Sequence, residues 1–243
     1  MLVTAYLVVC GGWLALATWR PALWPPATPP STDHPYRDAA LAILAIAGVL
    51  LLGQAYRAGY LLPTSGESVG RLAWVVDNLL IYSPIALVLA IRRQSPRTVY
   101  LSADALATKV AFGLGLGVLS VLLFLLLRGE PGRVMEILAS AFEGKRGANF
   151  VPVFLEGVAL AFAFVRLRWA MGLWPALVLP AVLFALAHVP GQIQEGRVLA
   201  EMAAFFVLNS VLVSLILYVA QRSQDVIWLG IVHYLMDIAI QAI

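Results

Sequence analysis

The feature that most constrains this chain is a series of apolar runs, each long enough to cross a lipid bilayer. A hydrocarbon core of about 30 Å takes about 20 helical residues to span. On that measure the sequence contains about eight spans, at residues 2–19, 38–56, 72–91, 108–127, 149–167, 172–189, 198–220 and 225–243. A backbone inside a bilayer must satisfy its own hydrogen bonds, so runs of this length predict helices. The expected fold is therefore all-α, a polytopic integral membrane helical bundle.

The composition excludes a soluble protein. Of the 243 residues, 62% are hydrophobic and 12% are charged, whereas soluble domains carry roughly 25% charged residues. The excess of Lys and Arg lies between the apolar runs, where it anchors helices at the interface, so we expect a lipid bilayer as partner and no nucleic acid. These charges divide almost equally between the loops on the two sides of the membrane, so they do not define the orientation of the protein in the bilayer. Cys10 is the only cysteine, which excludes an internal disulfide and a cysteine-based zinc cluster.

The connecting segments differ in character. Residues 20–37 are rich in proline and are expected to be extended, and residues 56–71 form a Gly/Ser/Pro loop. In residues 131–142 the apolar positions recur at helical spacing, which predicts a short helix on the membrane surface.

Two groups of residues inside the spans have a structural interpretation. Gly113 and Gly117, with Gly115 between them, form a face of small residues that lets another helix approach closely. Asp77 and Asn78 are a polar pair within the third span. They either form a buried structural hydrogen bond or belong to a functional site.

The apolar run Asn149–Arg168 contains a single carboxylate, Glu156. An ionised carboxylate at that depth costs several kcal/mol unless it is paired or hydrated, so an intramembrane acid suggests a functional site. At 1.5 Å per residue, Glu156 lies about 10 Å from the end of its run. The same measure places His188, His233 and Asp237, from two other helices, about 5 to 15 Å from that side. One layer therefore collects two imidazoles and two carboxylates.

The spacing within these helices adds to the site hypothesis. His233 and Asp237 are four residues apart and share a helix face, so the carboxylate can orient the imidazole or both can contact one ligand. Phe184 and His188 have the same spacing. Pro190 is expected to end the helix and leave His188 at a hydrated opening. Singly, each residue could instead make a structural hydrogen bond, but all four at one level favour a shared polar site.

One carboxylate and two imidazoles support two kinds of chemistry. Glu156 can act as a general base on a water molecule, with one histidine relaying the proton and the other polarising a carbonyl. Alternatively, Glu156, His188 and His233 can bind a zinc ion that activates the water. Both routes lead to hydrolysis of an amide in a pocket within the membrane. The sequence contains neither a His-Glu-x-x-His nor a Gly-x-Ser-x-Gly motif.

At these residues the chain resembles the CPBP intramembrane proteases, also called the Abi family, which include CAAX prenyl endopeptidases and bacteriocin-processing proteins. Members carry E-E-x-x-x-R, then F-x-x-x-H, then H-x-x-x-N or H-x-x-x-D on successive helices. Phe184-Ala-Leu-Ala-His188 and His233-Tyr-Leu-Met-Asp237 match the last two motifs in order and spacing. The resemblance covers about residues 98–243, so we expect a core there and an N-terminal segment of about three spans, residues 1–97, without a motif.

The first motif departs from the family pattern. The segment beginning at Glu156 has Gly157 in place of the second Glu and Ala161 in place of the Arg. The missing acid removes a possible ligand, which favours a metal-free glutamate mechanism with no required cofactor and leaves zinc as the alternative. The missing Arg removes an ion pair, and Arg166 is too far along the helix to replace it.

The resemblance implies an intramembrane endopeptidase of a bacterial or archaeal cell membrane, acting on a peptide or a membrane protein. It implies water activation by Glu156 and His188 and oxyanion stabilisation by His233 with Asp237. We expect Phe184 and Gly157 to contact the substrate. The departures in the first motif support an alternative, a catalytically silent member that binds a peptide or serves as an immunity or scaffold protein. A third possibility, an ion-coupled carrier using Glu156 and Asp77, lacks inverted repeats.

Overall fold

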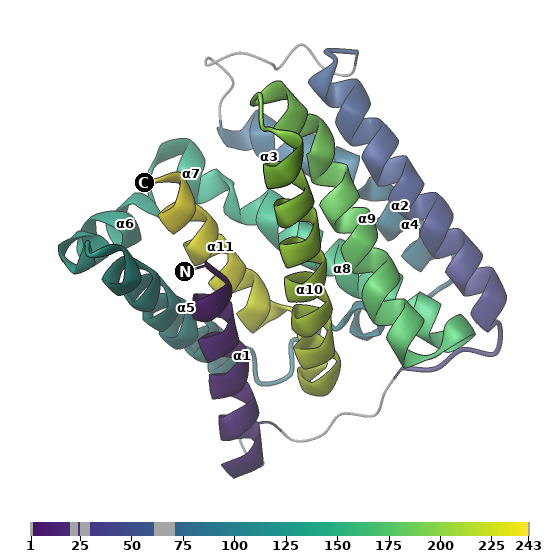
Figure 1. Cartoon of the computed structure of the whole chain (residues 1–243). Coiled ribbons are helices and arrows are strands. Elements are labelled where there is room, and N and C mark those ends of the chain that lie inside the picture. Colours follow the sequence, from purple (N-terminus) through teal and green to yellow (C-terminus); the bar gives the residue numbers. More distant parts are fainter. Residues whose placement is uncertain (1, 20–23, 25–29, 61–70, 243) are drawn as a thin grey trace.

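The computed structural model describes residues 2–19, 24, 30–60 and 71–242, and these residues form helices and loops without a strand (Figure 1). The all-α prediction is confirmed. The principal helices are α1 (Leu2–Trp19), α2 (Pro35–Arg57), α3 (Arg71–Ile81), α4 (Ser83–Ile91), α5 (Leu106–Arg128), α6 (Val134–Ser140), α7 (Gly144–Ala148), α8 (Phe150–Met171), α9 (Leu173–Gln194), α10 (Leu199–Ser223) and α11 (Ile227–Gln241).

Six of the described helices are long and apolar enough to cross a membrane, namely α1, α2, α5, α8, α9 and α10. Helices α3 and α4 can form a seventh crossing, with a bend of 50° between them. Helix α11 is apolar but has only 15 residues. At 1.5 Å per residue it is about 22 Å long, shorter than a hydrocarbon core of about 30 Å. The eight predicted runs are therefore helical, but the third is broken and the eighth is short.

The break in the third run has a local cause. Helix α3 ends at Ile81, and α4 begins at Ser83 with Pro84 in its first turn. Proline has no backbone N–H to donate to the preceding turn, and its ring clashes with that turn. The prediction of one continuous helix over residues 72–91 is therefore wrong, and Tyr82 lies at the break.

Helix α3 also carries the polar pair Asp77 and Asn78, and both side chains are buried. The Asn78 Nδ2 atom donates a hydrogen bond to the backbone carbonyl of Trp74 at 2.8 Å. Asn78 therefore makes a buried structural hydrogen bond, which is one of the two roles expected for this pair.

The glycines of α5 form the contact with α11. A Cβ atom on Gly113 would lie 2.9 Å from the Cα of Trp228, and one on Gly117 would lie 2.6 Å from a methyl carbon of Leu235. A side chain would fit at Gly113 only if a helix shifted, and at Gly117 only if Leu235 shifted, so the predicted close approach is confirmed. Gly115 faces elsewhere, because a Cβ atom there would have no neighbour within 4 Å.

The start of α11 is held by a buried ion pair. Asp225 has no exposed side-chain surface, and its Oδ1 accepts hydrogen bonds from the backbone N–H groups of Ile227 at 2.8 Å and Trp228 at 3.2 Å. Its Oδ2 lies 2.6 Å from the Nζ of Lys109 on α5. The side chain thus caps the helix and links it to α5, and so determines where His233 lies along the bundle.

A second polar cluster joins α8 to the N-terminal helices. The guanidinium of Arg166 is buried, donates to Gln94 Oε1 at 2.6 Å and to the Thr98 carbonyl at 3.0 Å, and lies 4.0 Å from the centre of the Phe162 ring. Gln94 in turn donates to Asp38 Oδ2 of α2 at 3.2 Å. Arg166 therefore has its own partners and does not pair with Glu156, as its distance along the helix predicts.

The loop predictions have mixed outcomes. Of the proline-rich connector, residues 20–23 and 25–29 lie outside the described residues, and residues 30–34 precede α2 without helix. Most of the loop at residues 56–71 also lies outside them, since residues 61–70 are not described. The short helix expected within residues 131–142 is present as α6, preceded by a 3₁₀ turn at Pro131–Arg133.

Candidate functional site

Glu156 and His188 lie at the same level of the bundle. Glu156 is six residues after the start of α8 at Phe150, and His188 is six residues before the end of α9 at Gln194. Each is therefore about 9 Å from that end of its helix. The prediction that α9 ends at Pro190 is wrong, because the helix continues through this residue. A proline removes one backbone hydrogen bond and can bend a helix without ending it.

One cavity of about 460 Å³ lies among α1, α8, α9, α10 and α11. It is lined by every residue that the sequence singles out for the site, namely Glu156, Gly157, Phe184, His188, His233 and Asp237. All six are half-buried. The structure thus brings together residues that are up to 81 positions apart in the chain.

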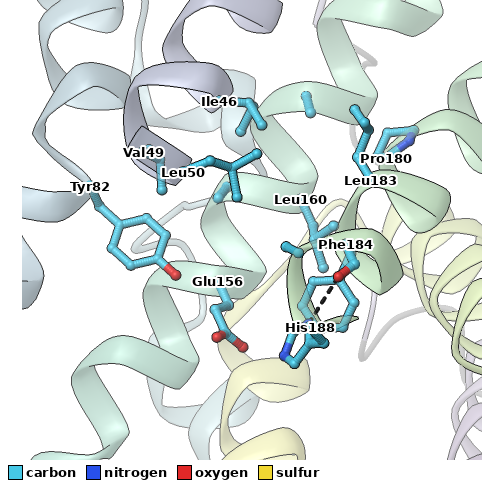
Figure 2. Close-up of a pocket in the computed structure, with 13 residues that line it drawn as sticks. Ile46, Val49, Leu50, Tyr82, Glu156, Leu160, Pro180, Leu183, Phe184 and His188 are labelled. Atoms are coloured by element: carbon cyan, nitrogen blue, oxygen red, sulfur yellow. Dashed lines mark hydrogen bonds between the residues drawn. The ribbon is translucent and has the colours of Figure 1, made fainter. Parts of the chain in front are cut away.

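The hydrogen bond made by His188 defines its tautomer. Its Nδ1 lies 2.9 Å from the backbone carbonyl of Phe184, and a carbonyl can only accept, so Nδ1 carries the proton. In the neutral ring, Nε2 then keeps a lone pair that can accept a proton or a hydrogen bond. The Phe184 ring packs on the imidazole with 4.5 Å between ring centres, which holds the ring in place. Figure 2 shows the Glu156 carboxylate and the His188 ring turned toward one another.

Glu156 and His233 keep their hydrogen-bonding capacity for the cavity. The described residues provide neither side chain with a hydrogen-bond partner. His188 and Asp237 line the same cavity as these two side chains. Polar groups in protein interiors are nearly always hydrogen-bonded. A group of partnerless polar side chains around one cavity is therefore suited to binding water or a polar ligand.

Of the two arrangements expected for His233 and Asp237, the described residues do not show the one in which the carboxylate orients the imidazole. The Asp237 Oδ2 accepts a hydrogen bond from Gln241 Nε2 at 2.7 Å, and the described residues show no hydrogen bond between Asp237 and His233. Side chains on a helix lean toward its N-terminus. Gln241 therefore leans onto Asp237, whereas the His233 ring leans away from it.

The zinc alternative requires Glu156, His188 and His233 to come together around one ion. In the part of the chain that the structure describes, no three His, Cys, Asp or Glu side chains come together as a metal site. Glu156, His188 and His233 line one cavity but do not converge on a single point there.

A second, smaller cavity of about 110 Å³ adjoins the first between α2, α8 and α9. It is mostly apolar and shares Glu156, Leu160, Phe184 and His188 with the large cavity. Figure 2 shows Tyr82, from the break between α3 and α4, with its hydroxyl directed toward Glu156. Glu156 and His188 therefore lie between an apolar recess and the larger cavity.

Some cavity residues were not predicted from the sequence. Tyr6 on α1 is 6% exposed and lines the large cavity, as does Asn209 on α10, whose Nδ2 donates to the Phe205 carbonyl at 2.9 Å. An asparagine and a tyrosine inside apolar runs were the available signal. That signal does not indicate which of the other helices they face.

The departures from the family's first motif lie in the wall of the same cavity. Gly157 and Ala161 both line it. A Cβ atom on Gly157 would have no neighbour within 4 Å, so the position has room for a side chain that this chain lacks. The wall beside Glu156 is therefore open where the family pattern has a second acid.

Comparison with known proteins does not identify a family for this chain. The resemblance to the CPBP proteases thus depends on the motifs alone, and any function must be argued from the cavity. No family model, no curated protein and no solved structure matches the sequence.

Proposed function

We propose that this protein is an intramembrane endopeptidase that hydrolyses a peptide bond of a peptide or membrane-protein substrate in the large cavity. The observation that supports this most strongly is the set of groups on the cavity wall. Two carboxylates and two imidazoles, from three helices, line the cavity, and Glu156, His233 and the Nε2 of His188 have no described partner. That is the donor and acceptor set that activation of a water molecule requires.

In the proposed mechanism a water molecule is held between the Glu156 carboxylate and the His188 Nε2. Glu156 takes a proton as the water oxygen bonds to the carbonyl carbon. The carbonyl oxygen becomes an oxyanion and accepts a hydrogen bond from His233. When the carbon–nitrogen bond breaks, the proton held by Glu156 passes to the leaving amine. The products are a carboxylic acid and an amine, and Glu156 is ionised again.

The hydrogen bond from His188 to the Phe184 carbonyl contributes to this mechanism. It keeps the proton on Nδ1, so the unprotonated Nε2 is the atom available to the water. Because the imidazole is already oriented, no reorganisation is needed when the substrate binds.

Cleavage of a mixed peptide library by the purified protein in detergent tests the proposal. Glu156→Gln and His188→Ala should each lower the rate by about 10²- to 10⁴-fold, the usual contribution of a general acid–base group. Matched controls are Glu201→Gln and His34→Ala, because both side chains are exposed and outside the described cavities. Both controls should keep the wild-type rate.

Each variant is assayed with and without a chelator. Activity that survives chelation but disappears in the two cavity variants supports the glutamate mechanism. Activity lost on chelation and restored by zinc would replace it with a metal-dependent one. Equal activity in Glu156→Gln and Glu201→Gln would refute the role of Glu156.

A silent peptide-binding protein is the second candidate, and the open wall at Gly157 and Ala161 favours it. A protein of this kind would bind library peptides without cleaving them. Retained binding by folded wild-type protein, with no product from any peptide, would select this candidate over the protease.

A further inference from the structure

We propose that Tyr6 of α1 is a further catalytic residue, whose hydroxyl donates a hydrogen bond to the oxygen of the scissile carbonyl as the water attacks. This inference depends on the proposed peptidase function. It assigns a role to the N-terminal segment, which carries none of the motifs that suggest that function.

The first support is the position of Tyr6 in the cavity. The residue is 6% exposed and lines the same cavity as Glu156, His188 and His233. Both carboxylates, Glu156 and Asp237, also lie on the wall of this cavity. Tyr6 is therefore close to the groups that would surround the reacting carbonyl.

The second support is the way α1 is attached to the bundle. Helix α1 packs against α5 and α10 (Figure 1). Its Trp13 stacks on Trp228 of α11 with 5.9 Å between ring centres. Tyr6 precedes Trp13 by seven residues, which is two helical turns, so both lie on the same face of α1. The stacked tryptophans thus direct that face toward the interior of the bundle, where the cavity lies.

The third support is that the Tyr6 hydroxyl has no hydrogen-bond partner among the described residues. Buried tyrosine hydroxyls usually have one. Tyr234, for example, donates to the carbonyls of Ala141 and Arg146. A buried phenol left without a partner beside a polar cavity is positioned to donate to a ligand there.

The chemistry favours the carbonyl oxygen as the acceptor. A phenol is neutral, so it adds no charge beside the carboxylates of Glu156 and Asp237. Its hydrogen bond becomes stronger as the acceptor oxygen gains negative charge, which happens only when the tetrahedral species forms. With His233 it would complete a pair of donors, the usual arrangement around an oxyanion.

The test compares Tyr6→Phe with Tyr100→Phe in the library cleavage assay, using the best peptide found for the wild type. Tyr6→Phe removes only the hydroxyl. It should lower kcat on the order of 10²-fold, as loss of one oxyanion donor does, and change KM by less than about twofold. Tyr100 is buried to a similar degree, at 2% exposure, but packs on Phe164 and lines neither described cavity, so its variant should keep the wild-type kcat.

A second readout uses a phosphinate analogue of the same peptide, whose tetrahedral centre mimics the attacked carbonyl. Tyr6→Phe should weaken binding of the phosphinate by the same factor by which kcat/KM falls. In a Glu156→Gln background, where cleavage is slowed by about 10²- to 10⁴-fold, it should leave binding of the uncleaved peptide unchanged. This pattern separates stabilisation of the transition state from a general loss of structure.

Three results would overturn the assignment. Unchanged kcat in Tyr6→Phe would remove Tyr6 from the mechanism while leaving the peptidase proposal intact. A fall in kcat matched by a lower melting temperature and by weaker binding of the uncleaved peptide would show a structural role. No cleavage by the wild type would refute the proposed function itself, and the Tyr6 assignment with it.

Discussion

Replacing Gly113 with alanine should loosen the contact between α5 and α11 that positions His233. The added methyl carbon would lie 2.9 Å from the Cα of Trp228 and 3.0 Å from the Cβ of Ile231, whereas carbon atoms in contact rest about 3.5–4.0 Å apart. The Trp228 atom belongs to the backbone and cannot rotate away. The methyl group therefore fits only if α11 moves as a whole by about 0.5–1 Å.

The expected change in the free energy of unfolding of Gly113→Ala is the balance of two opposing contributions. Overpacking of this kind costs about 1–3 kcal/mol, and the better helix propensity of alanine offsets about 1 kcal/mol of that. The expected net loss is about 0–2 kcal/mol in the free energy of unfolding. Gly115→Ala is the matched control, because a Cβ atom there has no neighbour within 4 Å. The difference between the unfolding free energies of the two variants cancels the contribution of helix propensity. It isolates a packing cost of about 1–3 kcal/mol.

Unfolding of the detergent-solubilised protein by sodium dodecyl sulfate, followed by tryptophan fluorescence, measures this difference. Gly113→Ala should unfold at a lower denaturant fraction than the wild type, and Gly115→Ala at an equal or higher one. The proposed peptidase activity should fall in the first variant alone, since α11 carries His233 and Asp237. Identical unfolding curves for the two variants would refute the tight contact on which the argument depends.

Three further predictions use other contacts. Lys109→Met removes the counter-ion of the buried Asp225 and should cost about 3–5 kcal/mol in the same titration; a loss below 1 kcal/mol would contradict that. Arg166→Lys cannot reproduce the planar fork of donors and should lower the melting temperature without changing kcat, because the residue lines neither described cavity. The half-buried Arg133 donates hydrogen bonds to the exposed Glu136 and lowers its pKa. This pair therefore stabilises the fold above about pH 4.3, the ordinary pKa of Glu, and the stabilisation is lost as the pH falls through the lower folded pKa. The melting-temperature difference between wild type and Glu136→Gln should therefore be present at neutral pH and vanish in acid. A difference that stayed constant with pH would refute this role of the Arg133–Glu136 pair.

Much of the architecture could be predicted because its signals are local. Run length and composition predict membrane helices, and a fixed rise per residue predicts that Glu156 and His188 share a level. Gly113 and Gly117, four residues apart, predict a close helix contact. The sequence also contains a sign of the broken third run, since Pro84 is read directly from it, although a run of apolar residues alone suggests continuity.

The features that were missed depend on rotamers or on distant contacts. Asp237 is equally spaced from His233 and Gln241, and only the direction in which helical side chains lean selects Gln241. Tyr6 joins the cavity because α1 docks on α11 through Trp13, more than two hundred residues away in sequence from its partner Trp228. No periodicity within α1 indicates that docking.

The length of α11 bears on how the proposed hydrolysis would be supplied with water inside a bilayer. At about 22 Å it falls about 8 Å short of a hydrocarbon core of about 30 Å, and most of its residues are buried by other helices instead of facing lipid. Buried helices need not match the bilayer thickness, but the polar groups at their ends must still be satisfied. Water that reached the C-terminal end of α11, near Asp237 and Gln241, would satisfy those polar groups. The short helix would then bring the aqueous phase to the cavity, and hydrolysis would need no separate water channel.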